Sequence, residues 1–352
     1  MPGAHLSRVA ERASDACIPL QVLWELTRRC HLSCRHCYVP PPDAAATELD
    51  RGEIRRVLAE LRAAGAFFLT LTGGEIFLRP DVLEIARAAR RLGFAVRLFT
   101  TGTLLRRQQV DEIARLRPTA VELSVYGATA EAHDGVTGSP GSFRRTLRAA
   151  VRLRRAGVPV VLKSPLLRSL GDAAFDLPAL ARRLGVGVRL DPAVARPERG
   201  PHAAATPRRS EGPVERPPVV SVARLFLAHG VGAPLVPPPE PGATPCAIAR
   251  RVVRIGPTGL VYPCALYCEP AGDLRAAPFD AIWRESPLLL RLRSTTVDDL
   301  RGACAGCDRA GYCGRCTALA LAEHGDALGP SSEACDRAAA REAARAGGST
   351  TT

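Results

Sequence analysis

Three cysteines lie close together at Cys30, Cys34 and Cys37, directly after a largely apolar run from Leu20 to Leu26. Their C-x3-C-x2-C spacing puts three thiolates on one short loop. Three thiolates can ligate three irons of a [4Fe–4S] cube and leave the fourth iron without a protein ligand. Ferredoxin-type carriers supply a fourth cysteine, so this loop predicts a cluster that binds something else. A zinc loop is the alternative, although zinc usually takes paired C-x2-4-C units.

The last third of the chain holds a larger group of cysteines. Its eight members are Cys246, Cys264, Cys268, Cys304, Cys307, Cys313, Cys316 and Cys335. Twelve cysteines in all, with no signal-peptide core in residues 1–16, favour metal or redox chemistry over disulfides, because reducing compartments do not keep structural disulfides. The longest apolar runs are too short to span a bilayer. We therefore expect a cytoplasmic metalloprotein without a membrane partner.

The formal charge of +13 raises nucleic-acid binding as a rival function, because clustered basic residues attract phosphate. The basic residues are spread along the chain and are almost all arginine, since Lys163 is the only lysine. Aromatic residues make up 5% of the chain, too few to suggest a stacking platform for single strands. The composition argues against a nucleic-acid partner and is compatible with an acidic peptide.

The elements that must position the first cysteine loop are short apolar runs alternating with amphipathic stretches, which is typical of βα units on a parallel sheet. Strands are expected near residues 20–26, 67–72, 95–100, 120–124, 158–163 and 186–191. Helices are expected near residues 49–64, 80–92, 107–116, 142–156 and 177–184. Six units fall short of a closed eight-stranded barrel, so the α/β fold predicted is a partial (β/α)6 barrel. Its site would lie at the C-terminal ends of the strands.

Composition divides the chain around this barrel of residues 20–192. Residues 193–242 are rich in Pro and Arg, which predicts a linker with one short helix near Val219 to Ala228. Residues 243–340 form a small cysteine-rich α+β domain with a β-hairpin around residues 256–259 and a helix near 279–291. Residues 1–19 are an N-terminal segment, and residues 341–352 are expected to be a disordered tail.

Two motifs together resemble the radical S-adenosylmethionine (radical SAM) superfamily. The first is the three-cysteine loop, with the aromatic His36 before its last cysteine; the second is Gly73-Gly74-Glu75, one βα unit later. In that family SAM chelates the open iron, and a GGE motif contacts its amine. The resemblance implies catalytic roles for the three cysteines and cofactor binding by Gly73, Gly74 and Glu75. Paired glycines also occur in plain βα turns. The proline that commonly follows the motif is Ile76 here.

Three further strand-end residues are candidate SAM contacts. Thr101 and Ser124 look like family positions, and their hydroxyls suit ribose or carboxylate hydrogen bonds, although such groups also satisfy loop backbone. Relatives often carry an aspartate after the serine strand, where this chain has Tyr126. Lys163 ends the fifth strand and could bind the SAM carboxylate or an acidic group of the substrate; a solvated lysine is the alternative.

The cysteines of the last third resemble the SPASM extension of radical SAM enzymes, which houses two auxiliary [4Fe–4S] clusters. Their pattern is C-x12-G-x4-C, then C-x2-C-x5-C-x2-C, then a final cysteine. The resemblance implies a first auxiliary cluster on Cys246, Cys264 and Cys316, with Cys268 as candidate fourth ligand. It implies a second cluster on Cys304, Cys307, Cys313 and Cys335. A tail with two zinc ions is the alternative reading.

The resemblance implies an enzyme that reductively cleaves SAM to methionine and a 5′-deoxyadenosyl radical, which removes a hydrogen atom from the substrate. The expected substrate is a ribosomally made peptide that undergoes cross-linking, thioether formation or epimerisation. The expected partners are a small leader-peptide-binding protein and a flavodoxin- or ferredoxin-type electron donor. The alternatives are a protein side-chain maturase of the anaerobic sulfatase type, a tetrapyrrole-tailoring enzyme and, from a different class, a zinc-bearing nucleic-acid-binding module.

Overall fold

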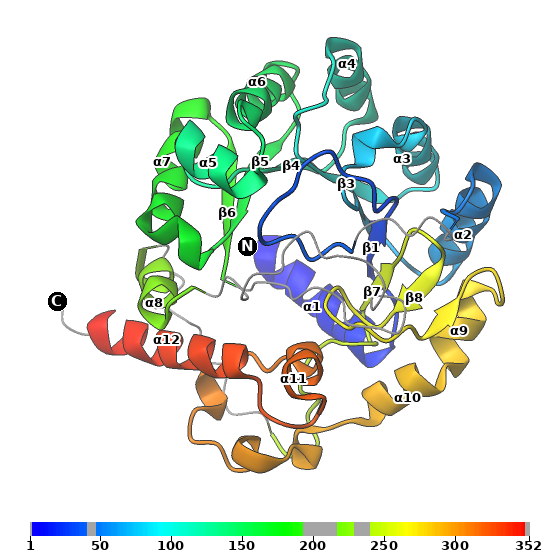
Figure 1. Cartoon of the computed structure of the whole chain (residues 1–352). Helices are drawn as coiled ribbons and strands as arrows, with labels where there is room; N and C mark the ends of the chain where they lie inside the picture. The colour runs from blue at the N-terminus through cyan, green and yellow to red at the C-terminus, as the bar shows by residue number, and fades with distance from the viewer. Residues whose placement is uncertain (1, 41–46, 193–216, 229–239, 349–352) are drawn as a thin grey trace.

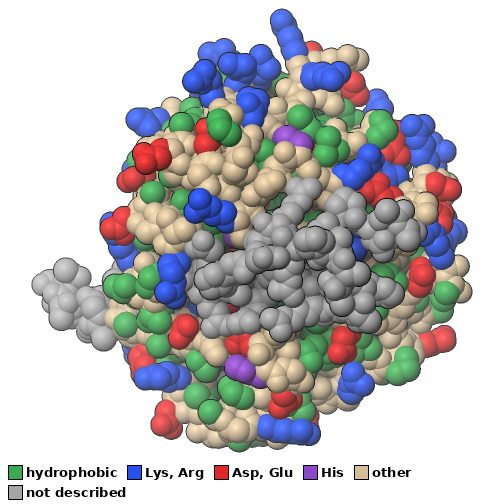
Figure 2. All heavy atoms as spheres, in the orientation of Figure 1, with side chains coloured by type: hydrophobic (Ala, Val, Ile, Leu, Met, Phe, Trp, Pro, Cys, Tyr) green, Lys and Arg blue, Asp and Glu red, His purple; other side chains and the backbone are tan. Residues whose placement is uncertain are grey.

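The computed structural model describes residues 2–40, 47–192, 217–228 and 240–348. In these ranges nine strands form one sheet in the order β6-β5-β4-β3-β2-β1-β7-β8-β9. Most of the expected linker, residues 193–216 and 229–239, lies outside the described residues. No helix of the described chain is long and apolar enough to cross a membrane. On the face drawn in Figure 2, acidic side chains lie among the basic ones.

The six expected strands are all present and pair in parallel in chain order. They are β1 (Gln21–Glu25), β2 (Phe68–Thr72), β3 (Ala95–Thr100), β4 (Ala120–Ser124), β5 (Val160–Pro165) and β6 (Gly187–Asp191). The expected helices α2 (Arg51–Ala63), α3 (Val82–Arg91), α4 (Arg107–Leu116), α6 (Ser142–Arg155) and α7 (Leu177–Leu184) cover the outside of the curved sheet (Figure 1). The predicted partial α/β barrel is therefore confirmed.

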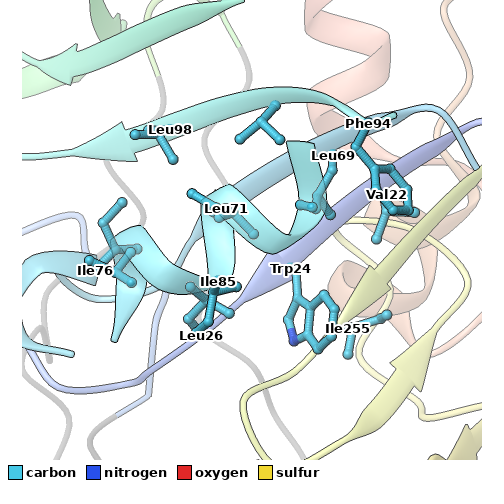
Figure 3. Packing of buried hydrophobic residues seen from close by; sticks show 14 of the residues in the cluster. Val22, Trp24, Leu26, Leu69, Leu71, Ile76, Ile85, Phe94, Leu98 and Ile255 are labelled. Carbon is cyan, nitrogen blue, oxygen red and sulfur yellow. The ribbon is translucent and has the colours of Figure 1, made fainter. Parts of the chain in front are cut away.

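Alternation along the strands explains which face the helices cover. Leu69 and Leu71 of β2 are fully buried in the core with Leu98 of β3, and the residues between them face the interior of the barrel. In the same core the indole of Trp24 lies beside Ile255 (Figure 3). Helix α2 begins at Asp50, whose side chain accepts a hydrogen bond from the backbone N of Glu53 in a capping box.

The predicted hairpin is present, but it belongs to the barrel sheet. Strand β7 (Val252–Ile255) pairs in parallel with β1, and β8 (Leu260–Tyr262) and β9 (Gly272–Asp273) continue antiparallel. Buried Arg254 of β7 lies 3.4 Å from the carboxylate of Glu25 on β1. The division at residue 242 therefore separates two segments of one continuous sheet.

Two sequence predictions about helices are wrong. The stretch 279–291 forms two helices, α9 (Phe279–Glu285) and α10 (Pro287–Ser294), because Pro287 has no N–H to continue α9 and starts a new helix. The expected disordered tail is helical to residue 348, since α12 runs over Ser332–Gly348. The tail's alanines favour a helix, and Ala340 and Ala344 are buried against another element.

That element is α8 (Val219–Ala228), the helix expected inside the linker. Val222 and Leu225 of α8 share an apolar cluster with Ala340 and Ala344 of α12. In Figure 1, α12 runs from the neighbourhood of α11 (Thr317–His324) to α8 beside the β6 edge. The C-terminal helix thus joins the cysteine-rich region to the open side of the partial barrel.

The remaining elements are short or lie at the ends of the barrel. They are α1 (Pro2–Asp15), α5 (Ala130–Thr137) and the 3-10 turns η1 (Ile76–Leu78), η2 (Arg168–Asp176), η3 (Val297–Asp299), η4 (Gly302–Cys304) and η5 (Ala310–Tyr312). The sequence pattern missed α5, because this eight-residue helix has no long apolar stripe.

Candidate active site

The three-cysteine loop follows the C-terminal end of β1 and rests on the end of α5. The backbone N of Ser33 donates to the carbonyl of Thr137 at 3.1 Å, and that of Arg35 donates to the carbonyl of Val136 at 3.0 Å. A Cβ on Gly138 would lie 3.3 Å from the Ser33 carbonyl oxygen, so the two segments pack closely. Hydrogen bonds to the barrel thus help to fix the backbone of the loop.

The thiols of Cys30 and Cys37 lie close enough to the Cys34 thiol to act on it electrostatically. Burial is the main cause that raises the pKa of the Cys34 thiol to about 12, and the nearby Cys37 and Cys30 raise it further. A thiolate is the form that ligates metal, so binding at this loop requires a cationic group that removes the protons. Three half-buried thiols on one strand-end loop fit a three-cysteine iron–sulfur site.

Gly73 and Gly74 lie against the chain that leads from β1 into the cysteine loop. A Cβ on Gly73 would be 2.3 Å from the carbonyl oxygen of Thr27, and one on Gly74 would be 2.4 Å from that of Arg29. The backbone N of Gly74 donates to the Thr27 carbonyl at 2.8 Å. No side chain fits at either glycine, so the pair is required for this backbone approach.

Glu75 is fully buried, and its carboxylate joins β2 to the end of β3. One oxygen accepts from the backbone N of Phe77 at 3.0 Å and from the Thr100 hydroxyl at 2.7 Å. The other accepts from the backbone N of Thr101 at 2.8 Å and from its hydroxyl. These four hydrogen bonds to one carboxylate fix the Thr100–Thr101 turn.

A chain of hydroxyls continues from this carboxylate to the cysteine loop. The Thr101 hydroxyl lies 2.9 Å from the Thr103 hydroxyl, which lies 2.6 Å from Nε2 of His31. Burial is the main cause that lowers the pKa of His31, while Glu75 opposes that shift. The sequence prediction included the turn that carries Thr101 but not its links to Glu75 and His31, since only the fold brings these residues together.

Ser124 and Lys163 lie side by side at the register Ser124↔Lys163 of β4 and β5. The Lys163 ammonium lies 4.2 Å from the ring centroid of Phe99 on β3. Burial is the main cause that lowers the pKa of Lys163, and Glu122 and Asp191 oppose the shift. The lysine thus lies over Phe99 on the inner face of the sheet, and its role in binding an anion stays a prediction.

Charged residues inside the barrel escaped the sequence prediction. Glu122 of β4 is 2% exposed and lies between Arg97 of β3, at 3.2 Å, and Arg189 of β6, at 3.6 Å. Each occupies an interior-facing position in an otherwise apolar strand, which is a usable signal once the inner face is known. With Lys163, they give the interior near β3 to β6 an excess of positive charge.

The cysteines of the last third gather into two groups. Burial is the main cause that raises the pKa of the Cys264 thiol to about 12, and the nearby Cys316 and Cys246 raise it further. The pKa of Tyr267 is raised mainly by burial, and the neighbouring Cys268 is among the groups that raise it further. The second group is Cys304, Cys307, Cys313 and Cys335, in which the pKa of Cys313 is raised first by burial and then by the other three.

Apart from Cys268, these groups contain the cysteines of the two ligand sets expected from the sequence, and all ligand roles stay a prediction. Among the described residues, no three His, Cys, Asp or Glu side chains converge tightly enough to hold a single metal ion. Cys307 and Cys335 are exposed, whereas the other cysteines are half-buried. The thiol donors suit iron–sulfur clusters as well as zinc.

The fold and these thiol groups define an iron–sulfur enzyme built on a partial parallel barrel. A model of the radical SAM superfamily matches residues 24–176, and a model of an iron–sulfur cluster-binding domain, SPASM, matches residues 246–308. The PqqA peptide cyclase of Ruegeria pomeroyi is 31% identical over 94% of this chain and 92% of its own length. The chain belongs to the radical SAM superfamily and carries a SPASM domain, which confirms the predicted family, enzyme class and cofactors.

Further similarities agree with the family and the fold. Mycofactocin maturase MftC of Mycobacterium tuberculosis is 30% identical over 90% of this chain and 82% of its own. An AdoMet-dependent heme synthase of Methanosarcina barkeri is 29% identical over 88% and 94%. Streptococcus suis SuiB bound to precursor peptide SuiA has a TM-score of 0.70, with 14% identity, over 94% of this chain and 80% of that one. Native anSMEcpe with bound AdoMet has a TM-score of 0.67, with 15% identity, over 93% and 96%.

Proposed function

We propose that this protein modifies a ribosomally made peptide by radical chemistry started from SAM. The observation that carries the proposal is full-length similarity to two enzymes named for peptide work, PqqA peptide cyclase and mycofactocin maturase, at 31% and 30% identity. The candidate reactions are cross-linking, thioether formation and epimerisation. The same architecture in SuiB bound to its precursor peptide supports a barrel interior that can admit a peptide.

In this proposal Cys30, Cys34 and Cys37 hold the cluster to which SAM binds. That cluster supplies the electron for SAM cleavage, and the barrel orients the substrate and excludes quenching groups. Gly73 and Gly74 let the strand ends approach closely. Glu75 holds Thr101 in place, so its role toward SAM includes positioning the turn. Cys246, Cys264 and Cys316, with Cys268, and Cys304, Cys307, Cys313 and Cys335 hold the auxiliary clusters.

Ser124 and Lys163 are proposed to contact SAM or an acidic group of the substrate from the inner face of β4 and β5. A charge-assisted hydrogen bond there is worth about 1.5–3 kcal/mol, or about ten- to a hundredfold in affinity. Lys163→Met deletes the charge and keeps the apolar stem. Weaker SAM binding would assign the lysine to the cofactor, and lost turnover with normal SAM binding would assign it to the substrate. Wild-type values in both assays would contradict the proposal.

The test of the function uses anaerobically reconstituted protein with SAM, dithionite and the short peptide encoded beside its gene. We expect 5′-deoxyadenosine together with a peptide product. Loss of two hydrogens would indicate a cross-link or thioether, and solvent deuterium at one Cα would indicate epimerisation. An unmodified peptide in the presence of steady 5′-deoxyadenosine formation would contradict this substrate class.

A tetrapyrrole is the second candidate substrate, because two AdoMet-dependent heme synthases are similar to this chain at 29% and 27% identity. The same assay with a haem-precursor tetrapyrrole separates the two functions, since only the true substrate raises 5′-deoxyadenosine formation above the substrate-free rate. A maturase of the sulfatase type would act on a side chain of a folded protein. A tetrapyrrole substrate or a protein substrate would leave the proposed ligand sets of the clusters unchanged.

The proposed partners are a small leader-binding protein and a flavodoxin- or ferredoxin-type electron donor, in the cytoplasm. The thiol-rich sites support a reducing compartment. Pull-down with the precursor peptide as bait tests the first partner, and 5′-deoxyadenosine formation with reduced flavodoxin in place of dithionite tests the second. No leader-dependent capture and no flavodoxin-driven cleavage would remove these two partners.

A further inference from the structure

Tyr126 touches the three-cysteine loop from the segment between β4 and α5. Its hydroxyl lies close enough to the Cys34 thiol and to the Ser124 hydroxyl to interact with both. The ring is 6% exposed and belongs to the same apolar cluster against which Cys34 packs. A buried phenol therefore lies beside one of the proposed ligands.

The surroundings of Tyr126 fix this orientation. Its ring packs edge-on against His36, with centroids 4.8 Å apart, and lies 5.4 Å from the ring of His133. Its backbone N donates to Nδ1 of His133 at 3.1 Å. Because ring and backbone are both held, the hydroxyl has a fixed place beside the Cys34 thiol.

We propose that Tyr126 is a positioning residue that raises the reduction potential of the cluster held by Cys30, Cys34 and Cys37. Hydrogen bonds to ligand sulfurs tune iron–sulfur potentials. The reduced cluster carries one more negative charge than the oxidised cluster, so a donor to a thiolate stabilises it more. The Ser124 hydroxyl polarises the phenol and strengthens the effect. This inference rests on the proposed role of Cys34 as a ligand.

The direct test is Tyr126→Phe, which removes the hydroxyl and keeps the ring. The cluster is followed in the anaerobic holoenzyme by electron paramagnetic resonance during a potentiometric titration, and it is recognised by the change in its signal on adding SAM. At a fixed potential we expect the reduced-to-oxidised ratio to fall about three- to tenfold, where tenfold corresponds to about 59 mV for one electron. Iron content should stay at the wild-type level.

Two further variants bracket this measurement. Tyr262→Phe removes the hydroxyl of another buried tyrosine, on β8, and should leave this potential unchanged. Ser124→Ala should lower the potential as well, but by less than Tyr126→Phe does. This variant still tests the inference if Tyr126→Phe does not assemble its cluster. Equal potentials in wild type, Tyr126→Phe and Ser124→Ala would overturn the inference. A wild-type protein without any SAM-responsive cluster would instead overturn the proposed function.

Discussion

The first cysteine loop and the second auxiliary group both carry thiols for a proposed cluster, but their backbones are held in different ways. The loop of residues 30–37 is held by barrel hydrogen bonds, including those from Ser33 and Arg35 to α5. The segment of residues 304–316 contains only short 3-10 turns, and its backbone bonds join near neighbours, such as Cys313 to Ala310. We therefore expect the barrel to hold its site before a cluster binds, and the tail to depend on its cluster for part of its folding energy.

The largest expected effect comes from changing Cys30, Cys34 and Cys37 together to alanine. We expect loss of about four irons out of about twelve and no 5′-deoxyadenosine formation, because the SAM-binding cluster is gone. Since the barrel holds this loop by itself, tryptic cleavage after Arg35 should stay within about twofold of wild type. Stoichiometric zinc with little iron in anaerobically purified wild type would contradict the cluster assignment, and rapid cleavage after Arg35 would contradict the comparison.

The matched experiment in the tail is Cys313→Ala with Cys335→Ala. We expect about four fewer irons and continued substrate-free SAM cleavage. Tryptic cleavage after Arg309 and Arg315 should accelerate at least about tenfold, because the open form of this segment becomes more populated without its cluster. Iron content and proteolysis measure the two effects separately. If both arginines stay as resistant as in the wild-type protein, the tail folds without its metal and the contrast with the barrel fails.

Local patterns predicted the barrel well because each βα unit carries its own signal. The strands at residues 95–100 and 120–124 were found at their observed bounds. The parallel pairing of β7 with β1 could not be predicted, since it joins residues 21 and 252 and neither strand carries a mark of its distant partner. The helical tail was missed because its stability depends on contact with α8, which is remote in sequence.

The candidate site shows the same limit. The family resemblance that the cysteine spacing carries predicted which thiols the fold brings near one another. Glu75 was predicted to contact the cofactor, yet its four donors come from Phe77, Thr100 and Thr101, which only the register of β2 and β3 brings together. Residue types can identify a ligand set, but a network of positioning hydrogen bonds requires the fold.

A smaller effect tests whether α12 closes the barrel. Ala344 of α12 is 4% exposed and packs with α8, while its neighbour Ala343 is exposed. Ala344→Glu buries an unpaired charge and should lower the free energy of unfolding by about 2–4 kcal/mol, and Ala343→Glu should change it by less than about 0.5 kcal/mol. Denaturant unfolding of the two variants gives the comparison. Equal stability would mean that α12 can detach from α8 at little cost.

The smallest effect concerns His133. This residue belongs to α5, the helix that supports the first cysteine loop, and contacts Tyr126. Burial lowers the pKa of His133 to about 4 from an ordinary value of 6.5, and Asp134 opposes the shift only in part. The unfolded chain therefore binds a proton between these values that the folded chain does not. Stability should be full above pH 6.5 and should fall as the pH approaches 4, by about 2 kcal/mol between pH 8 and pH 5.

His133→Gln removes this titration while an amide oxygen can still accept from the backbone N of Tyr126. The difference in the free energy of unfolding between variant and wild type at pH 8 measures the packing cost of the substitution. The further change in that difference between pH 8 and pH 5 measures the contribution of the His133 proton. We expect the pH dependence of the variant to be shallower than that of wild type by about 2 kcal/mol over this range. Parallel pH profiles would show that His133 takes up its proton without opening the structure. The support of the cysteine loop by α5 would then be looser than its hydrogen bonds indicate.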